Sequence, residues 1–242
     1  MATKEIAGKT HDPEIAHVFL ELMEQTSFWL DLQEPYIDHA LTDLLPDISL
    51  DLEYSDIFEI TNIFSKIIDA KSKSTALHTH GIIEKSEIMG NYYKYYQEKI
   101  SKMKIAASLH DLGKLAVSNA IIDKPGKLTD EEYEQIKTHP YLAYFMLRGI
   151  LGFDEEIKQW IYTHHEKLNG SGYPLGLKSD DLSFEQRLLT CIDIYQALRE
   201  NRPYRDGMNH NKAMSIMHEM AYKNEIDLNI VKDIDAVFVT LV

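Results

Sequence analysis

The chain has one cysteine among its 242 residues, Cys191, so it cannot form an internal disulfide. That usage fits a reducing cytoplasm, and the simplest interpretation of Cys191 is a small buried apolar residue on a helix. Long apolar runs are also missing, since none approaches the roughly 18 residues that a membrane-spanning helix needs. The first residues lack the apolar stretch of a secretory signal. We therefore expect a cytoplasmic protein without a membrane span.

Basic residues are scarce, with 25 Lys and Arg against 39 Asp and Glu and a formal net charge of -14. This balance argues against binding to a nucleic-acid polymer, which needs a basic face. It does not exclude a small anionic substrate, because metal ions and a few local cations can reverse the field inside a pocket. The chain is also rich in histidine, with 11 residues, and their placement decides what they indicate.

Apolar residues recur at helical spacing along the chain, which predicts a series of amphipathic helices. One of these predicted helices runs from about Gln97 to Leu109 and should direct Ile100, Met103 and Ala107 towards the core. Sustained alternation with a period of two is missing, so the predicted fold class is all-α. The other stripes are Ile15–Val18–Phe19–Leu22–Met23, Ile57–Ile60–Phe64–Ile67–Ile68, Ala213–Ile216–Met217–Met220 and Ile230–Ile234–Val237–Phe238.

Capping residues predict where several helices begin, and breakers predict the loops. We expect the helix opened by Asp154 to continue as far as His164 and His165. The acidic stretch 43–55 is the best candidate for a boundary, which predicts an N-terminal helical segment of unknown role at 1–55 and a main domain at 56–242. The other helix-start signals are Thr129 with Glu132, Ser183 with Gln186, and Pro140, and the predicted loops are 124–126 and 169–176.

Three features of the sequence carry chemistry, and each is weak by itself. His110-Asp111 follows an apolar run, with Lys114 one helical turn beyond His110. His164 and His165 are adjacent, and on a helix they would diverge by about 100°, leaving one in the core and one in water. Asp193 lies on an apolar helix, where a carboxylate should be paired, capped or bound to a metal.

Taken together, these imidazoles and carboxylates form the ligand set expected for divalent iron, manganese or zinc-like ions. A carboxylate such as Asp111 can bridge two ions, and a hydroxide held between them can attack phosphorus in line. The leaving alkoxide then needs a proton or a positive charge, which Lys114 could supply.

Four ordered motifs are similar to those of the HD-GYP family, the cyclic di-GMP phosphodiesterases of the HD metal-dependent phosphohydrolase superfamily. His110-Asp111-Leu112-Gly113-Lys114 resembles the motif that names the HD hydrolases, and 164–174 resembles the second signature, which ends in Gly-Tyr-Pro. The stretch 122–129 followed by His139-Pro140 is similar to the connecting segment, and 193–205 to the closing helix with its Arg-Pro-Tyr-Arg. The resemblance runs from about Ile57 to the C-terminus and implies a helical bundle with a metal site in its core.

The resemblance also implies a role for individual residues. It implies two divalent metal ions, with iron or manganese expected first. Asp111 would bridge them and, with Lys114, carry the catalysis. Tyr173 would line the mouth of the pocket, although an aromatic plug that fixes the loop is an equal alternative. The ligands would be His78, His110, Asp111 and Asp193 for one ion and Asp111, His139, His164 and His165 for the other, with Arg202, Arg205, Tyr173 and Lys114 contacting substrate.

The sequence departs from the family pattern at a few positions. Some relatives carry an acid four residues before the first ligand, where it helps hold a third ion, but here that position is Ser74. His80 is a nearby histidine that we interpret as a bystander, so we expect two ions. Gln196 stands where an acid is common and Gly81 where arginine is common, and we interpret both as variation without loss of activity.

The implied function is hydrolysis of cyclic di-GMP to linear pGpG, with further cleavage to GMP left open. One alternative is a preference for the mixed 3',3'-cyclic GMP-AMP. Another is a catalytically weak signalling module that contacts diguanylate cyclase domains through the Gly-Tyr-Pro loop. A nucleotidase of the broader HD superfamily is disfavoured by that loop. A homodimer is compatible with the sequence.

Overall fold

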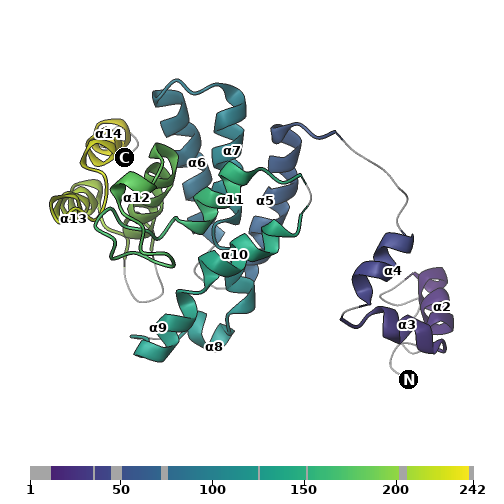
Figure 1. Cartoon of the computed structure of the whole chain (residues 1–242). Helices are drawn as coiled ribbons and strands as arrows, with labels where there is room; N and C mark the ends of the chain where they lie inside the picture. Colours follow the sequence, from purple (N-terminus) through teal and green to yellow (C-terminus); the bar gives the residue numbers. More distant parts are fainter. Residues whose placement is uncertain are drawn as a thin grey trace. The chain divides into compact units, whose positions relative to one another are not determined.

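The computed structural model describes residues 12–34, 36–44, 51–71, 76–124, 126–150, 152–201 and 206–239, and these contain helices but no β-strand. The chain divides into two compact units, 1–51 and 52–242 (Figure 1). Our predicted boundary at Ser55 falls inside a helix that begins at Tyr54. None of the helices in the described part of the chain is long and apolar enough to cross a membrane.

The smaller unit contains α2 (Pro13–Leu22), α3 (Thr26–Asp31) and α4 (Ile37–Leu44). α2 begins after Asp12, whose carboxylate accepts the N–H groups of Glu14 and Ile15, as expected for an N-cap. The predicted stripe from Ile15 to Leu22 lies on α2, but most of its side chains are exposed. A unit of this size has little interior in which to bury them.

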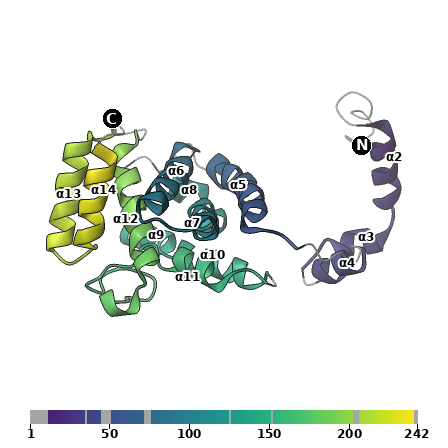
Figure 2. The same cartoon turned by 90° about the horizontal axis from the view of Figure 1, so that it is seen from above.

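The larger unit is a helical bundle, seen from two sides in Figures 1 and 2. α6 packs against both α7 and α12, α5 packs on α7 at one edge, and α13 and α14 pack together beside α12. Its elements are α5 (Tyr54–Lys71), α6 (Ala76–Tyr92), α7 (Gln97–Leu109), the 3-10 helix η1 (Leu112–Ala116), α8 (Asn119–Ile122), α9 (Asp130–Ile136), α10 (His139–Arg148), α11 (Glu155–Tyr162), the 3-10 turn η2 (Ser179–Asp181), α12 (Phe184–Arg199), α13 (His210–Tyr222) and α14 (Leu228–Phe238).

The core of this unit lies between α6, α7, α10, α11 and α12 and continues between α12, α13 and α14. Residues predicted to point inward on α7, Ile100, Met103 and Ala107, are buried. Cys191 is also buried, in agreement with its interpretation as a small apolar residue. The two predicted capping boxes, at Thr129 and at Ser183, are both present with reciprocal hydrogen bonds. The starts of α9 and α12 therefore follow from local chemistry that the sequence displays.

α5 buries only part of its predicted apolar stripe: Ile68 is buried and Ile57 packs against the core. Ile60, Phe64 and Ile67 are exposed, whereas Thr61, Ser65 and Asp69 face the interior. Small polar side chains allow α5 to lie close to α7, and the hydroxyls of Thr61 and Ser65 donate to backbone carbonyls within the helix. The apolar side of α5 is thus left at the surface.

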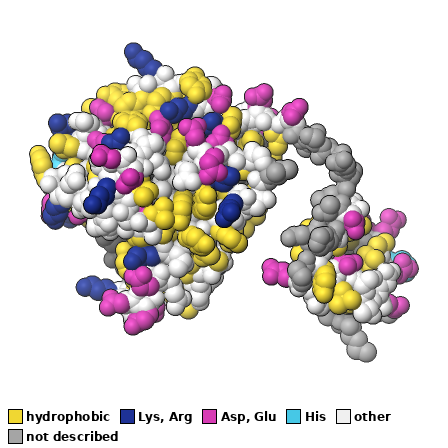
Figure 3. All heavy atoms as spheres, in the orientation of Figure 1, with side chains coloured by type: hydrophobic (Ala, Val, Ile, Leu, Met, Phe, Trp, Pro, Cys, Tyr) yellow, Lys and Arg dark blue, Asp and Glu magenta, His cyan; other side chains and the backbone are white. Residues whose placement is uncertain are grey.

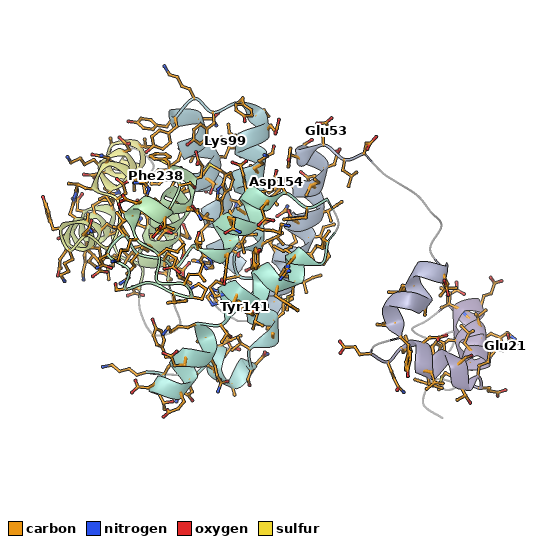
Figure 4. All side chains as sticks on the ribbon, in the orientation of Figure 1. Glu21, Glu53, Lys99, Tyr141, Asp154 and Phe238 are labelled. Atoms are coloured by element: carbon orange, nitrogen blue, oxygen red, sulfur yellow. The ribbon has the colours of Figure 1, made fainter. Side chains whose placement is uncertain are left out.

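Asp154 connects three helices and allows a stability prediction. Its carboxylate accepts hydrogen bonds from the Tyr54 hydroxyl at 2.6 Å and, through Oδ1, from the N–H of Glu156 at 2.8 Å, and it pairs with Lys102 at 2.9 Å (Figure 4). Burial raises the pKa of Asp154, but the hydrogen bonds from Tyr54 and Lys102 outweigh burial and lower the pKa below its ordinary 3.8. A lowered folded-state pKa stabilises the fold above the unfolded value, and this contribution is lost as the pH falls.

We expect Asp154→Asn to lower the free energy of unfolding by about 1 kcal/mol near neutral pH, because asparagine keeps the helix cap but not the charge. The difference from wild type should shrink when thermal unfolding is measured below about pH 4. A difference that stays constant from pH 7 to pH 3 would contradict the ion-pair interpretation.

Candidate metal centre

Five separate segments bring the predicted metal ligands to one place in the larger unit. His78 lies in the first turn of α6, and Asp193 lies in the middle of α12. His110 and Asp111 follow the end of α7, His139 begins α10, and His164 and His165 follow α11. All of these side chains are buried except His165, which is partly exposed. The sequence separates the first and last of them widely, so only the fold assembles the group.

Gly113 allows two of these segments to meet. A Cβ atom at this position would lie 1.9 Å from the carbonyl oxygen of His139 and 2.8 Å from the backbone nitrogen of Ala143. Only glycine therefore lets η1 lie directly on the first turn of α10. This close approach places Asp111 beside His139.

The segment after His110 differs from our prediction. We expected His110 and Lys114 to share one helical face, but α7 ends at Leu109 and the chain continues as the 3-10 helix η1. The tighter turn directs Lys114 to Asp111, with 2.7 Å between Nζ and Oδ2. Lys114 is thus held by the central carboxylate.

The expected helical position of His164 and His165 is also wrong. α11 ends at Tyr162, and both histidines lie in the turn that follows. Their ring centroids are 4.1 Å apart, so they lie together and do not diverge as adjacent residues on a helix would. The end of α11 therefore delivers two imidazoles to the same place.

The donor atoms form two adjoining clusters. His78, His110 and Asp111 make the first cluster, and His139, His164 and His165 make the second, with the donor atoms of each within 4.8 Å of one another. Asp111 lies between them: its Oδ2 is 3.3 Å from Nε2 of His110, and its Oδ1 is 3.5 Å from Nε2 of His139. Asp193 adds its Oδ1 at 3.1 Å from Nε2 of His78. A carboxylate placed between two sets of imidazoles is suited to bridging two cations.

Backbone carbonyls fix the orientation of three of the rings. Nδ1 of His110, His139 and His164 contacts the carbonyl oxygen three residues earlier, at 2.7, 2.7 and 2.6 Å. Since a carbonyl only accepts, each Nδ1 carries a proton, and Nε2 is the nitrogen of each ring that faces the centre. This is the tautomer that metal-binding histidines adopt.

Several of the nitrogen and oxygen atoms that face the centre have no suitable hydrogen-bond partner among the described residues. Nε2 of His110 and Oδ1 of Asp111 are buried and, among the described residues, have no hydrogen-bond partner. Nε2 of His139 and His164 lie 3.2 Å apart, although both are lone-pair donors in this tautomer. Buried polar atoms left in this way are costly unless a cation lies between them, so the residues fit a metal centre.

The electrostatics differ between the two clusters. Burial lowers the pKa of His139 to about 3 and that of His165 to about 4, so both imidazoles are neutral near pH 7. Burial also lowers the pKa of His78, but hydrogen bonds with Asp193 and Glu200 outweigh burial and raise that pKa to about 10. The surroundings of His78 therefore favour a positive charge, supplied by a proton or by a metal ion.

The Gly-Tyr-Pro loop folds over the second cluster. The buried carboxylate of Glu166 holds the loop in place. It accepts hydrogen bonds from the N–H groups of Leu175, Gly176 and Leu177 at 2.6, 3.1 and 2.9 Å. The Tyr173 ring packs 4.9 Å from the ring of His165. The same ring lies 6.5 Å from that of Tyr133 on α9, so Tyr173 packs between the centre and α9.

Not every predicted residue can be placed. Arg202 and Arg205, the predicted phosphate contacts, and Ser74, the position of the missing acid, lie outside the described residues. His80 is exposed. The two family departures at positions 81 and 196 are linked, because a Cβ on Gly81 would meet the Gln196 carboxamide at 2.3 to 2.4 Å. The side chain of Gln196 occupies the space that glycine leaves.

Two buried acids near the centre escaped prediction. Asp69 accepts a hydrogen bond from Thr79 at 2.8 Å, and burial raises its pKa. Glu200 contacts Nδ1 of His78 at 2.8 Å. The polar face of α5 could have indicated Asp69, but Glu200 follows the end of a helix and gives no pattern.

A helical bundle that buries a centre of histidines and aspartates is typical of metal-dependent hydrolases. Comparison with known proteins identifies the family. The family model of the HD domain matches residues 62–230. The chain is 35% identical over 214 residues to a 3'3'-cGAMP-specific phosphodiesterase 3 from Vibrio cholerae serotype O1, covering 88% of the chain and 46% of that protein. It is 34% identical over 123 residues to the cyclic di-GMP phosphodiesterase response regulator RpfG from Xanthomonas campestris pv. campestris, covering 50% of the chain and 32% of that protein.

Solved structures agree with the fold. The structure of a cyclic GMP-AMP specific phosphodiesterase of V. cholerae, V-cGAP3, matches with a TM-score of 0.53 and 30% identity, over 100% of this chain and 56% of that one. Bd1817, an HDG"Y"P protein from Bdellovibrio bacteriovorus, matches with a TM-score of 0.57 and 16% identity, over 76% of this chain and 63% of that one. The chain belongs to the HD domain family, within its HD-GYP group.

HD-domain phosphohydrolases depend on metal ions, which agrees with the donor set of the centre. A 3'3'-cGAMP-specific phosphodiesterase 1 from V. cholerae is 29% identical over 220 residues, covering 89% of the chain. The chain spans 46% of the V. cholerae phosphodiesterase 3 and 51% of phosphodiesterase 1, about half the length of each.

Proposed function

We propose that this chain is a metal-dependent phosphodiesterase that hydrolyses a cyclic dinucleotide. The observation that carries the proposal is the pair of buried clusters that share Asp111, with Lys114 beside it. The kinship to cyclic-dinucleotide phosphodiesterases supports the substrate class.

The proposed centre holds two divalent ions, iron or manganese, and each residue has a distinct task. His78, His110 and Asp193 would hold one ion, and the second cluster the other. When bound, the ions supply a hydroxide nucleophile and neutralise the phosphate charge. Asp111 fixes the spacing of the two clusters. Lys114, 2.7 Å from Oδ2 of Asp111, is placed to donate a proton or a positive charge to the leaving oxygen.

Cyclic di-GMP and the mixed 3',3'-cyclic GMP-AMP are the two candidate substrates. Cyclic di-GMP, cleaved to pGpG, follows from the family motifs. The mixed dinucleotide is favoured by one specific observation: the two relatives that match almost nine tenths of the chain are both cGAMP-specific.

Parallel turnover assays with Mn²⁺ or Fe²⁺ test these alternatives, with the linear products separated by chromatography. Hydrolysis of either dinucleotide supports the proposed function, and the ratio of kcat/KM decides the preference. Failure to hydrolyse both by metal-loaded protein would favour the signalling module that contacts diguanylate cyclase domains.

We also propose that the chain forms a homodimer through the exposed apolar face of α5, defined by Ile60, Ile63, Phe64 and Ile67. These side chains are 45, 60, 46 and 53% exposed. An antiparallel pair of α5 helices would place Ile60 against Ile67 and Ile63 against Phe64 of the second copy.

The charges on α5 are compatible with that arrangement. Asp56 and Glu59 are exposed near its N-terminal end, and Lys66 is exposed near its C-terminal end. Antiparallel pairing brings the acidic end of one copy towards the basic end of the other. Parallel pairing would oppose like charges instead.

We expect wild-type protein to sediment as a dimer at micromolar concentration and Ile63→Glu to sediment as a monomer, because the two-fold axis places the new charges together. Tyr222→Glu, at an exposed aromatic residue on α13, is the matched control and should remain dimeric. A monomeric wild type contradicts the proposal. A dimer that survives Ile63→Glu also contradicts it, and would direct attention to the hydrophobic surface over α10, which includes Tyr141 and Phe145 (Figure 3).

A further inference from the structure

The orientation of His78 is secured differently from that of the three other fully buried histidines of the centre. His110, His139 and His164 each use a backbone carbonyl of their own segment. Nδ1 of His78 instead contacts Oε2 of Glu200 at 2.8 Å, and the Glu200 side chain is only 6% exposed. A buried carboxylate is thus directed at the outer edge of one ring of the centre.

We propose that Glu200 is a positioning residue for the first cluster. Its carboxylate fixes the ring of His78, keeps the proton on Nδ1 and strengthens Nε2 as a metal donor. This inference rests on the proposed function, in which His78 holds one of the two ions.

The geometry excludes Glu200 as a direct ligand beside His78. Nε2 of His78 is 3.1 Å from Oδ1 of Asp193, so the inner edge of the ring faces the centre. Glu200 contacts the other nitrogen, on the opposite edge of the ring. The imidazole therefore separates Glu200 from the position that an ion shared with Asp193 would occupy.

α12 holds both acids. Asp193 lies within the helix, and Glu200, seven residues later, is its C-cap, with its N–H bonded to the carbonyl oxygen of Gln196 at 3.1 Å. Residues seven apart lie on the same face of a helix, so α12 presents two carboxylates to one histidine. Their spacing along α12 fixes how the ring of His78, on α6, is turned.

Glu200 should also affect the two clusters differently. Through His78, Glu200 acts on the first cluster, with 2.8 Å between its Oε2 and Nδ1 of the ring. The second cluster consists of three imidazoles, and the carboxylates beside it are Asp111 and Asp193. The effect of Glu200 should therefore fall on one ion and not on both.

The test measures metal binding without any nucleotide. Wild type, Glu200→Ala and Glu200→Gln are stripped of metal, and Mn²⁺ stoichiometry and affinity are measured by elemental analysis and chelator competition. Glu185→Ala is the matched control, because Glu185 is a mostly buried acid on the same helix, paired with Lys99 and Tyr95 away from the centre.

We expect Glu200→Ala to bind one of two ions 10–100-fold more weakly, the range found for outer-shell partners of metal ligands, and to leave the other ion unchanged. Glu200→Gln should be intermediate, because its amide oxygen still accepts the Nδ1 proton but lacks the charge. Glu185→Ala should bind both ions as wild type does.

Equal affinities in wild type and Glu200→Ala would overturn the inference, as would an equal loss of both ions in Glu200→Ala and Glu185→Ala. If Glu200→Ala does not fold, Glu200→Gln decides, since its side chain has nearly the same shape. The proposed function is tested separately: a selective loss of one ion supports Glu200 even if wild type hydrolyses no cyclic dinucleotide.

Discussion

Replacing Asp111 with alanine is expected to remove bound metal and hydrolytic activity together. Its two oxygens lie 3.3 Å from Nε2 of His110 and 3.5 Å from Nε2 of His139, so it borders both clusters. Burial raises the pKa of Asp111, but the charges of His110 and Lys114 outweigh burial and hold it well below its ordinary range. The group is therefore an anion, and its loss would leave the two proposed cations without the carboxylate that lies between the clusters.

The expected loss of metal affinity exceeds the roughly 10–100-fold that follows changes outside the ligand shell. Elemental analysis after gel filtration and turnover of cyclic di-GMP and cyclic GMP-AMP measure the two losses. Asp111→Asn keeps the shape and removes the charge, and should retain less metal than wild type.

Asp235→Ala is the control for this prediction. Asp235 also contacts a buried histidine, with its Oδ1 2.9 Å from Nε2 of His210, but the pair belongs to α13 and α14. This variant should keep its metal and its activity. Full metal content and turnover in Asp111→Ala would show that Asp111 is not the bridging group.

The side chains that form the two clusters could be proposed as metal ligands from the sequence, although they lie far apart along the chain. His110-Asp111 and His164-His165 carry their motifs within a few residues, and the fold brings them together. The wrong expectations concern where helices end. Our helical interpretation placed His164 and His165 on diverging faces, whereas α11 stops at Tyr162. The residue at which a helix ends depends on tertiary contacts as well as on helix propensity. The spacing of the apolar residues gives no information about those contacts.

The predicted stripe on α5 is only partly buried, for a related reason. Hydrophobic periodicity identifies a stripe, but it does not identify what covers the stripe. Thr61, Ser65 and Asp69 face inward, and Asp69 bonds to Thr79 on α6. These polar side chains face inward because α5 packs closely against α7 near the charged centre. That packing is visible only in the folded bundle. Glu200 was missed in the same way, because its partner is 122 positions earlier in the chain.

Replacing Lys114 with methionine is expected to abolish most turnover while leaving the metal in place. Methionine keeps an unbranched, flexible stem but removes the ammonium group. Nζ of Lys114 is 2.7 Å from Oδ2 of Asp111, and the side chain is 25% exposed, so it can reach both the bridge and a bound phosphate. General acid catalysis by a positioned side chain typically contributes 10²–10⁴-fold, and we expect kcat to fall by about that factor.

Lys114→Arg separates the two tasks of the ammonium group. Arginine keeps the positive charge but does not release a proton at accessible pH. If Lys114 acts as the acid, Lys114→Arg should be nearly as slow as Lys114→Met. If Lys114 only stabilises charge, arginine should restore much of the rate. Metal content, measured on the same samples, should match wild type in both variants, because the seven proposed ligands are intact. A Lys114→Met enzyme that turns over within about threefold of wild type would remove Lys114 from the catalytic machinery.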